Sequence, residues 1–170
     1  FQGEQMSSNF ITPRYKARIR NAVWTFCHSH RDVNYWRRST PSVSYLTFPV
    51  SLTGCISATP FKRDVLFYGC KSQVREDLSG RFQESDLSSK FVFHYGLFGK
   101  ERDDEIDQSR VVLNLHYYPD ATLEVHRINY LLSRGKVIVS ERGSCAETNE
   151  LYKEILFFAE TGQMVDQVKE

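Results

Sequence analysis

The sequence predicts an α/β fold: a three-layer, Rossmann-like parallel sheet with helices on both faces. Two observations predict it. From about residue 61 onward, short apolar runs, most closed by a glycine or a polar loop, alternate with segments of helical pattern. The runs also lack the polar alternation of a half-exposed sheet, which is typical of parallel strands covered on both faces. Right-handed crossovers then arrange such strands and helices in Rossmann-like layers.

Composition supports a folded chain of ordinary type. The 170 residues are 41% hydrophobic and 25% charged, with a formal net charge of +1. This length normally forms one domain with a true core, and the small net charge gives no overall field that attracts nucleic acid or anionic membrane. We expect residues 1–5 to be a tag remnant, 6–60 a connecting helix with an extended segment, and 61–170 the Rossmann-like domain.

The N-terminal region predicts one long helix followed by extended chain. Apolar residues between Pro13 and Arg38 recur at roughly helical spacing, and Pro41-Ser42 ends the element. Residues 44–50 are typical of a short extended segment, and a loop follows to Pro60. The helical region is basic, which is typical of a solvated helix face and also occurs in helices that bind nucleic acid or lipid. Its basic residues are Arg14, Lys16, Arg18, Arg20, Arg31, Arg37 and Arg38.

The remaining chain predicts four strands and four helices. A helix between the last two strands has the apolar stripe Ala121, Val125, Ile128 and Leu132, and Gly135 follows where a C-cap favours glycine. The strands are expected at 64–68, 90–95, 111–116 and 136–140, and the other helices at 72–84, 101–109 and 148–160.

The expected site lies at the carboxyl ends of these strands, where ligands of open parallel sheets bind. The first strand leads to Gly69, Lys71 and Arg75, and the third to His116 and Tyr118. Glu124, expected in the first turn of the next helix, shares this edge. Helix N-termini with cations suit phosphate, a carboxylate suits a vicinal diol, and tyrosine faces suit a base or sugar ring. A nucleotide sugar uses all three.

Each of these residues also has an ordinary structural explanation. Glu124 can favour the helix dipole and pair with Arg127 three residues later. Lys71 and Arg75 can be surface charges, and His116 a packed core histidine. His28 and His30 diverge on a helix, and the four cysteines lack ligand spacing, so no metal site is expected. Scattered thiols instead favour a reducing compartment, and we expect a cytoplasmic protein without a membrane span.

The stretch VVLNLHYYPDATLEVHRINYLLSRGKVIVSE, from Val111 to Glu141, resembles the donor-binding half of GT-B glycosyltransferases of the group 1-like family. DVLFYGCKSQVRED, from Asp64, looks like that family's first strand and phosphate loop. The resemblance implies one GT-B-type lobe that binds a nucleotide sugar through the residues named above, Gly69, His116, Tyr118 and Arg127 among them. Within it, Glu124 would hold the ribose hydroxyls, and Lys71 with Arg75 the diphosphate, with no obligatory metal or other cofactor. His116 stands where many retaining relatives place the first glutamate of a Glu-x7-Glu motif.

The resemblance further implies transfer of a hexose from a nucleoside diphosphate sugar to an acceptor hydroxyl. The chain matches only the second of the two lobes such enzymes close over their substrates. It is therefore expected to be a piece of a longer transferase, to work with a partner that supplies the acceptor lobe, or to have lost the transfer. The alternative is a non-catalytic scaffold or interaction module, which could assemble as a homo-oligomer. Nucleic acid is not expected as a partner, because the overall basicity is missing.

Overall fold

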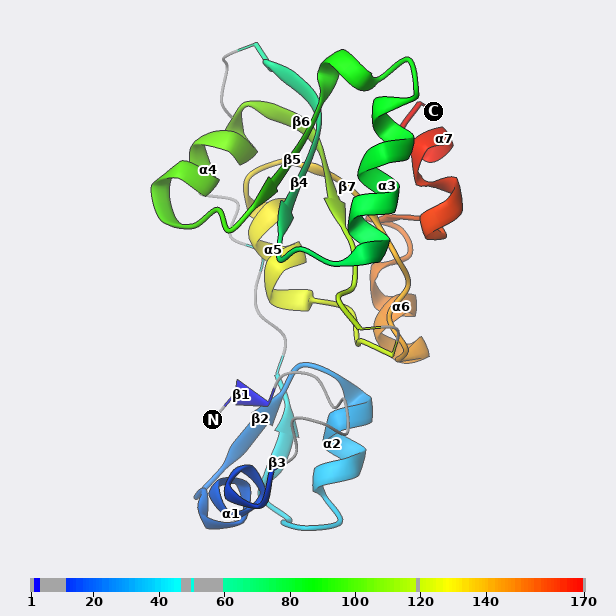
Figure 1. Cartoon of the computed structure of the whole chain (residues 1–170). Helices are drawn as coiled ribbons and strands as arrows, with labels where there is room; N and C mark the ends of the chain where they lie inside the picture. The colour runs from blue at the N-terminus through cyan, green and yellow to red at the C-terminus, as the bar shows by residue number, and fades with distance from the viewer. Residues whose placement is uncertain (1, 4–11, 47–49, 51–59, 119, 170) are drawn as a thin grey trace.

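The structure, a computed structural model, describes residues 2–3, 12–46, 50, 60–118 and 120–169. Figure 1 shows a larger α/β body built from the later part of the chain and a smaller body built from its first part. In the described part of the chain, no helix is both long and apolar enough to cross a lipid bilayer.

The larger body contains a five-stranded sheet in the order β5-β4-β6-β7-β8. Every neighbouring pair in it is parallel, which confirms the predicted parallel sheet. Four of its strands lie where the sequence predicts strands, and the fifth is an addition at one edge. The strands are β4 (Arg63–Gly69), β5 (Phe91–Tyr95), β6 (Ser109–Asn114), β7 (Val137–Ser140) and β8 (Phe157–Phe158).

Helices cover both faces of this sheet, as predicted. One face packs against α3 (Gln73–Gln83) and α7 (Met164–Lys169). The other packs against α4 (Gly99–Asp107), α5 (Val125–Ser133) and α6 (Ala146–Tyr152). Two 3-10 turns, η2 (Ser88–Lys90) and η3 (Thr161–Gln163), precede β5 and α7.

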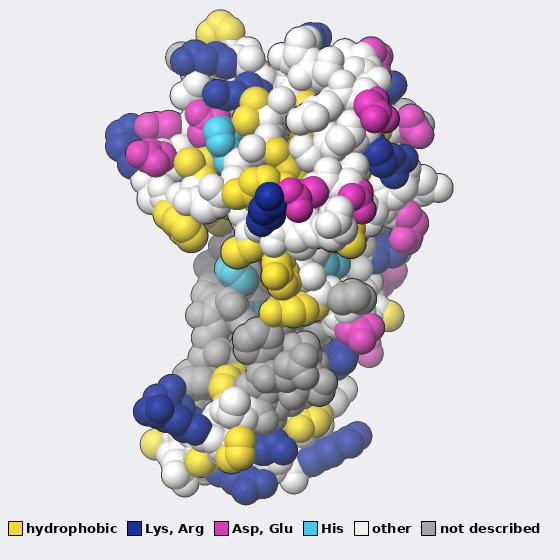
Figure 2. All heavy atoms as spheres, in the orientation of Figure 1, with side chains coloured by type: hydrophobic (Ala, Val, Ile, Leu, Met, Phe, Trp, Pro, Cys, Tyr) yellow, Lys and Arg dark blue, Asp and Glu magenta, His cyan; other side chains and the backbone are white. Residues whose placement is uncertain are grey.

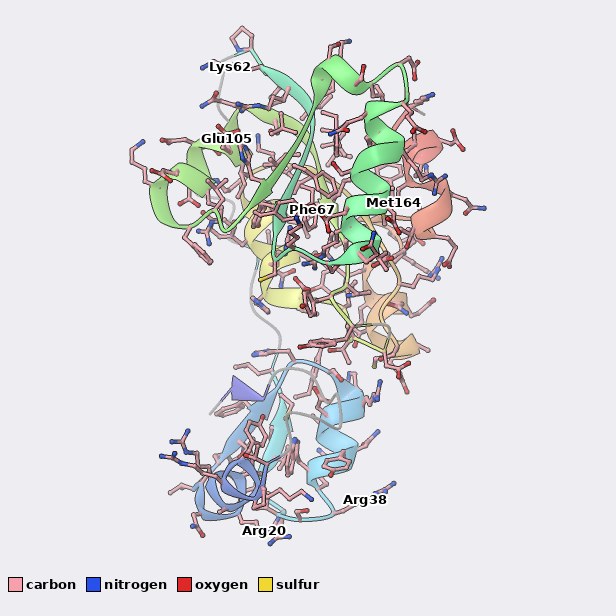
Figure 3. The ribbon with its side chains drawn as sticks, viewed as in Figure 1. Arg20, Arg38, Lys62, Phe67, Glu105 and Met164 are labelled. Carbon is pink, nitrogen blue, oxygen red and sulfur yellow. The ribbon has the colours of Figure 1, made fainter. Side chains whose placement is uncertain are left out.

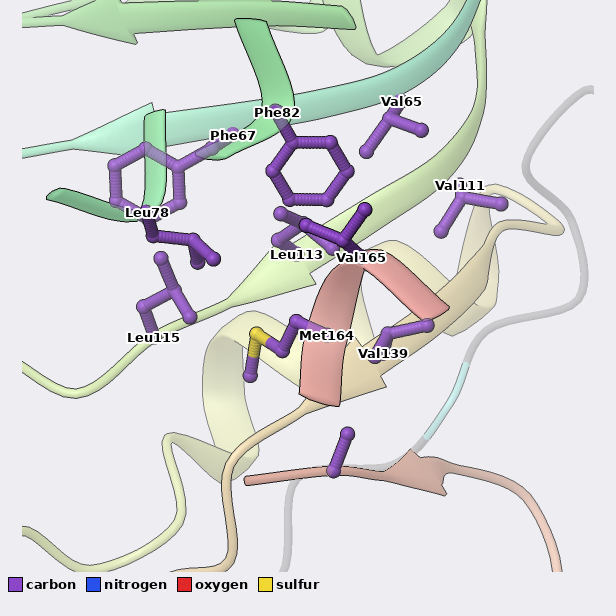
Figure 4. Packing of buried hydrophobic residues seen from close by; sticks show 11 residues of the cluster. Val65, Phe67, Leu78, Phe82, Val111, Leu113, Leu115, Val139, Met164 and Val165 are labelled. Carbon is purple, nitrogen blue, oxygen red and sulfur yellow. The ribbon is translucent and has the colours of Figure 1, made fainter. Parts of the chain in front are cut away.

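Alternate residues of β4 enter the two cores. Phe67 packs with Phe82 of α3 and Met164 of α7 on one face (Figure 4). Leu66 packs on the opposite face with Ile106 of α4 and residues of α5. A strand whose neighbouring positions are all buried needs a continuous apolar run, which explains the run seen in the sequence.

The smaller body is a second parallel sheet, of three short strands in the order β1-β2-β3. Its core contains Ile19, Cys27, Val33, Trp36 and Val43. Its elements are β1 (Gln2–Gly3), α1 (Pro13–Asn21), β2 (Thr25–Cys27), α2 (His30–Trp36) and β3 (Val43–Tyr45).

The prediction of one helix from Pro13 to Arg38 is wrong. α1 ends at Asn21, Ala22 is extended, and the β-favouring residues of β2 pair with β3. Ser29 then starts a new helix, because its hydroxyl accepts a hydrogen bond of 3.2 Å from the backbone N–H of Asp32. Gln2 and Gly3, set aside as tag remnant in the sequence, pair with β2 as β1. Of the expected extended segment, residues 47–49 lie outside the described residues.

Two helix boundaries in the larger body also differ from the prediction. α5 begins at Val125, so Glu124 is its N-cap residue and Ala121 lies in the preceding loop. The expected helix from residue 148 to 160 stops at Tyr152, because Phe157 and Phe158 pair with β7 and extend the sheet. Gly135 has a φ of 66° after α5, which confirms its predicted C-cap role.

Candidate functional site

The topology creates a crevice at the carboxyl ends of β4 and β6. From β4 the chain moves outward through α3 to β5, and it then returns through α4 to β6 on the other side of β4. The helices on the two sides of this reversal cover opposite faces of the sheet. Ligands of open α/β sheets bind at such a switch point, so the geometry selects the loops after Gly69 and Asn114.

Glu124 lies at this edge as the N-cap of α5, and its side chain makes no capping hydrogen bond. Its carboxylate lies 3.7 Å from Nη1 of Arg127, with 18% of the Glu124 side chain exposed. No described residue donates a hydrogen bond to that carboxylate. The expected pair with Arg127 therefore exists, at a distance that leaves the carboxylate oxygens available to further donors.

Arg127 is held against the strand ends. Its Nη2 donates a hydrogen bond of 2.8 Å to the Tyr68 carbonyl oxygen and a longer one of 3.3 Å to that of Leu113. The guanidinium lies 4.0 Å from the centre of the Tyr68 ring. Arg127 thus links the ends of β4 and β6 while it carries positive charge beside Glu124.

Arg75 makes a second link of the same kind. Its Nη1 donates to the Cys70 carbonyl at 2.7 Å, and its Nη2 donates to the Leu115 carbonyl at 2.6 Å. Burial lowers the pKa of Arg75, and the Glu124 and Glu141 carboxylates act against that lowering. The predicted contact of Arg75 with a diphosphate stays a prediction, and in this structure both terminal nitrogens already bond backbone carbonyls.

Gly69 and Lys71 have different surroundings. A Cβ atom on Gly69 would lie 3.0 Å from Cζ of Phe67 and 3.3 Å from Nη1 of Arg75, so glycine leaves the room that Arg75 needs. Lys71 is exposed and pairs with Glu76 at 2.7 Å, and this hydrogen bond raises the pKa of Lys71. Lys71 is therefore the more accessible of the two cations predicted for a diphosphate.

His116 and Tyr118 line a cavity of about 300 Å³ on the β6–β7 side of the edge. The backbone N–H of His116 donates to Oε2 of Glu141 at 2.6 Å, and Oε1 of Glu141 accepts from Thr161. The two ring nitrogens of His116 are buried without a hydrogen-bond partner in the structure. The cavity is lined by Val74, His116, Tyr117, Tyr118, Glu141, Arg142 and Glu160.

A second cavity, of about 400 Å³, lies between the N-terminal turns of α4 and α5. Glu124 and Arg127 line it together with four residues that the sequence did not single out for the site. Arg102 is one of them, and it bonds Asp103 at 2.8 Å and the Tyr130 hydroxyl at 3.4 Å. Its position in a polar, acidic segment gave no signal of a site. The lining residues are Tyr68, Arg102, Glu124, His126, Arg127 and Tyr130.

The structure therefore brings the seven predicted residues to one edge but divides them. Glu124 and Arg127 line one cavity, and His116 and Tyr118 line the other. Arg75 is electrostatically coupled to a carboxylate from each lining, Glu124 and Glu141. Among the described residues, no group of three or more His, Cys, Asp or Glu side chains is placed to bind a metal ion.

Comparisons with known proteins do not assign the chain to a family. No protein-family model matches it, and the search of curated proteins finds no matching sequence. The geometry of the carboxyl edge and the resemblance of residues 111–141 are therefore the basis for a proposed function.

Proposed function

We propose that this protein binds a nucleoside diphosphate sugar at the carboxyl edge of its five-stranded sheet, as the donor-binding lobe of a GT-B glycosyltransferase. The observation that carries the proposal is the Glu124 carboxylate. It lines the 400 Å³ cavity at the topological switch point and receives no hydrogen bond from a described residue. A carboxylate with free acceptor sites suits the two hydroxyls of a ribose.

The other residues around this cavity fit the rest of a nucleotide. Tyr130 is half-buried and offers part of its ring to a base, whereas the Tyr68 ring is already covered by the Arg127 guanidinium. Arg102 and Arg127 offer positive charge. In the proposed reaction, the anomeric carbon of the hexose forms a bond to the acceptor oxygen and its bond to the phosphate oxygen breaks. The nucleoside diphosphate leaves, and the hydroxyl proton passes to solvent. Lys71, Arg75 and the N-terminal amides of α3 would stabilise the charge that develops on the leaving group.

The proposed location of the protein is the cytoplasm. Cys27, Cys70 and Cys145 are free thiols, and two of the three are buried. Free thiols of this kind are usual in reducing compartments.

The test is a thermal-shift measurement with UDP-, GDP-, ADP- and CMP-sugars at millimolar concentration. We expect one nucleotide class to raise Tm, because a ligand that binds only the folded state stabilises it. Glu124→Gln should abolish the shift, since the amide keeps the size of the side chain but loses charge and acceptor capacity. For Lys71→Ala, the ligand concentration that gives the same shift in Tm should rise at least several-fold. The Tm without ligand should not fall, because Lys71 is exposed.

Glu147→Gln is the matched control. Glu147 is also a carboxylate at the start of a helix, in the first turn of α6, and it does not line the 400 Å³ cavity. If Glu124→Gln and Glu147→Gln lower Tm alike and leave nucleotide binding intact, Glu124 serves the helix dipole alone. If no nucleotide shifts Tm of the unmodified chain, the proposal fails and the non-catalytic interaction module is the better explanation.

A further inference from the structure

The smaller body carries a concentration of positive charge that the proposed function does not use. Residues 12–46 contain seven arginines and lysines against one acid, Asp32, which is only 2% exposed. Figure 2 shows dark-blue side chains, with hydrophobic ones between them, at the end of the smaller body that faces away from the larger one. We call this surface the basic pole and define it by Arg14, Lys16, Arg18, Arg20, Arg37 and Arg38, all exposed.

The cations of the basic pole form no ion pair within the described part of the chain. None of the six forms an ion pair with a described residue, whereas cations of the larger body commonly do, as in Lys90 with Asp64 and Lys169 with Asp86. Figure 3 shows Arg20 and Arg38 at the same end of the smaller body. Like charges that gather without counter-charges raise the local potential even when net charge is near zero.

The helix geometry spreads this charge over the whole exposed side of α1. Ile19 is the buried residue of the helix and faces the core of the smaller body. Arg14 and Arg18 lie on one flank of Ile19, and Lys16 and Arg20 lie on the other, because residues four apart share a face. A flat anionic partner can therefore meet cations from both flanks.

Two exposed apolar residues, Val23 and Trp24, follow α1 and its C-cap residue. Val23 is 93% exposed and Trp24 is 49% exposed. Trp24 donates a hydrogen bond of 3.2 Å from Nε1 to the Ser44 hydroxyl, which fixes its indole while much of the ring stays in solvent. Exposed aliphatic and indole groups beside arginines are typical of surfaces that lie at a membrane interface.

We propose that the basic pole binds the surface of an anionic lipid bilayer. The lipid headgroups would neutralise the six cations, each of which strengthens such binding several-fold. Val23 and Trp24 would enter the region between headgroups and acyl chains, which supplies the second attachment that stable peripheral binding needs. A nucleic acid fits less well, because its phosphates would neutralise the cations but leave the exposed side chain of Val23 in water.

The experiment measures co-sedimentation of the full chain with phosphatidylcholine vesicles that contain either no charged lipid or about one third phosphatidylserine. We expect binding only to the anionic vesicles, and loss of binding at high salt. Tryptophan emission should shift to the blue on binding. Since Trp36 is buried, the change reports Trp24.

Matched variants distinguish binding through the basic pole from an effect of the protein's overall net charge. Arg18→Glu with Arg20→Glu should lower vesicle binding at least tenfold. Lys62→Glu with Arg110→Glu changes the net charge equally on exposed positions of the larger body and should leave binding within about twofold. Val23→Ser should weaken binding several-fold without affecting the fold, because Val23 contributes little to the core.

Three results would overturn the proposal. The first is the absence of binding to anionic vesicles at low salt. The second is an equal loss of binding in the two double variants, which indicates an unspecific charge effect. The third is tight binding of a single-stranded oligonucleotide through Arg18 and Arg20 with no vesicle binding, which would make the pole a nucleic-acid surface.

Discussion

Two arginines, the buried Arg75 and the half-buried Arg127, hold the candidate site in shape. Arg75 and Arg127 approach the crevice from α3 and α5, on opposite faces of the sheet, and each bonds carbonyl oxygens on both sides of it. A guanidinium has several donors in a fixed plane, so it can satisfy carbonyls from two strands where a lysine ammonium cannot match the geometry. The basic residues that the sequence suggests for ligand binding thus also fix the positions of the ligand-binding loops.

Asp32 in the smaller body has the most strongly perturbed carboxyl group of the described acids. Burial raises its pKa to about 6, and the nearby Arg31 charge offsets this in part. Oδ1 of Asp32 has no hydrogen-bond partner in the structure. A carboxylate in such a place disfavours its own ionisation, so the folded state binds a proton that the unfolded state has already lost.

We therefore expect stability to fall as pH rises from about 4 to about 6. Below pH 4 the carboxyl is neutral in both states, and above pH 6 ionisation costs the folded state about 3 kcal/mol at most. Asp32→Asn removes this ionisation and should flatten the pH dependence in that range. Urea unfolding at several pH values measures the free energy of unfolding as a function of pH. If this free energy changes with pH in the same way for Asp32→Asn and the unmodified chain, the assignment is contradicted.

At the scale of elements, the loops at the carboxyl edge lock into one another. The backbone N–H of Gly143, in the β7–α6 loop, donates to Oδ1 of Asn149 at 2.9 Å, and Asn149 Nδ2 donates back to the Gly143 carbonyl at 2.6 Å. A Cβ atom on Gly143 would collide with the backbone of Leu123, in the loop before α5. The loop that carries Glu124 is therefore in direct backbone contact with the loop that follows β7.

Gly143→Ala should consequently lower the free energy of unfolding by about 2–4 kcal/mol, because backbone atoms must move to admit the methyl group. Gly80→Ala is the control: nothing lies within 4 Å of its would-be Cβ, and alanine is the better helix former. That variant should gain about 0.5–1 kcal/mol. Chemical denaturation of both measures the difference. Equal effects of the two substitutions would show that the loops are not locked at Gly143.

Much of the larger body could be predicted from the sequence, because its strands are continuous apolar runs and its helix ends have recognisable caps such as Gly135. β8 was missed because two phenylalanines after α6 continue a helical pattern, and only pairing with β7 makes them a strand. The smaller body was missed for a similar reason. Its strands of two or three residues have no periodicity of their own, and Ser29 alone marks the start of α2.

The candidate site could be predicted only in outline. Strand order and direction bring Glu124, His116 and Gly69 to one edge, and that follows from the parallel-sheet rule. The burial of Arg75 and the contribution of Arg102 depend on how α3 and α4 pack, for which the sequence contains no local signal. The division of the edge into two cavities is likewise a property of the packed side chains.

At the scale of the whole molecule, Arg31 connects the two bodies. From the start of α2, its Nη1 donates to the Asp120 carbonyl at 3.1 Å and to the Ser144 hydroxyl at 2.6 Å. Asp120 lies before α5 and Ser144 before α6, so both acceptors belong to loops of the carboxyl edge. The smaller body is thus attached to the same loops that position Glu124.

Arg31→Ala should loosen this attachment and increase the radius of gyration measured by small-angle X-ray scattering. The cost in unfolding free energy should stay below about 1 kcal/mol, because these hydrogen bonds are exposed. Arg37→Ala removes the same charge from the end of α2 and should leave the scattering unchanged. Identical scattering profiles for the two variants would mean that other contacts hold the bodies together.

The all-parallel pairing of the five-stranded sheet also has a consequence for how the chain folds. No two of its strands are joined by a tight turn, so each pairing requires a helical crossover to close first. β4 is the first strand of this body to be synthesised, and in the folded sheet it lies between β5 and β6. Its pairing with β6 joins residues that are separated in the sequence by α3, β5 and α4. Contacts between such distant residues slow folding, and β6 must remain unpaired until α4 has packed. During synthesis, the apolar β4 therefore stays partly uncovered until residues beyond Asn114 have left the ribosome, and this interval is when the chain is most prone to aggregate.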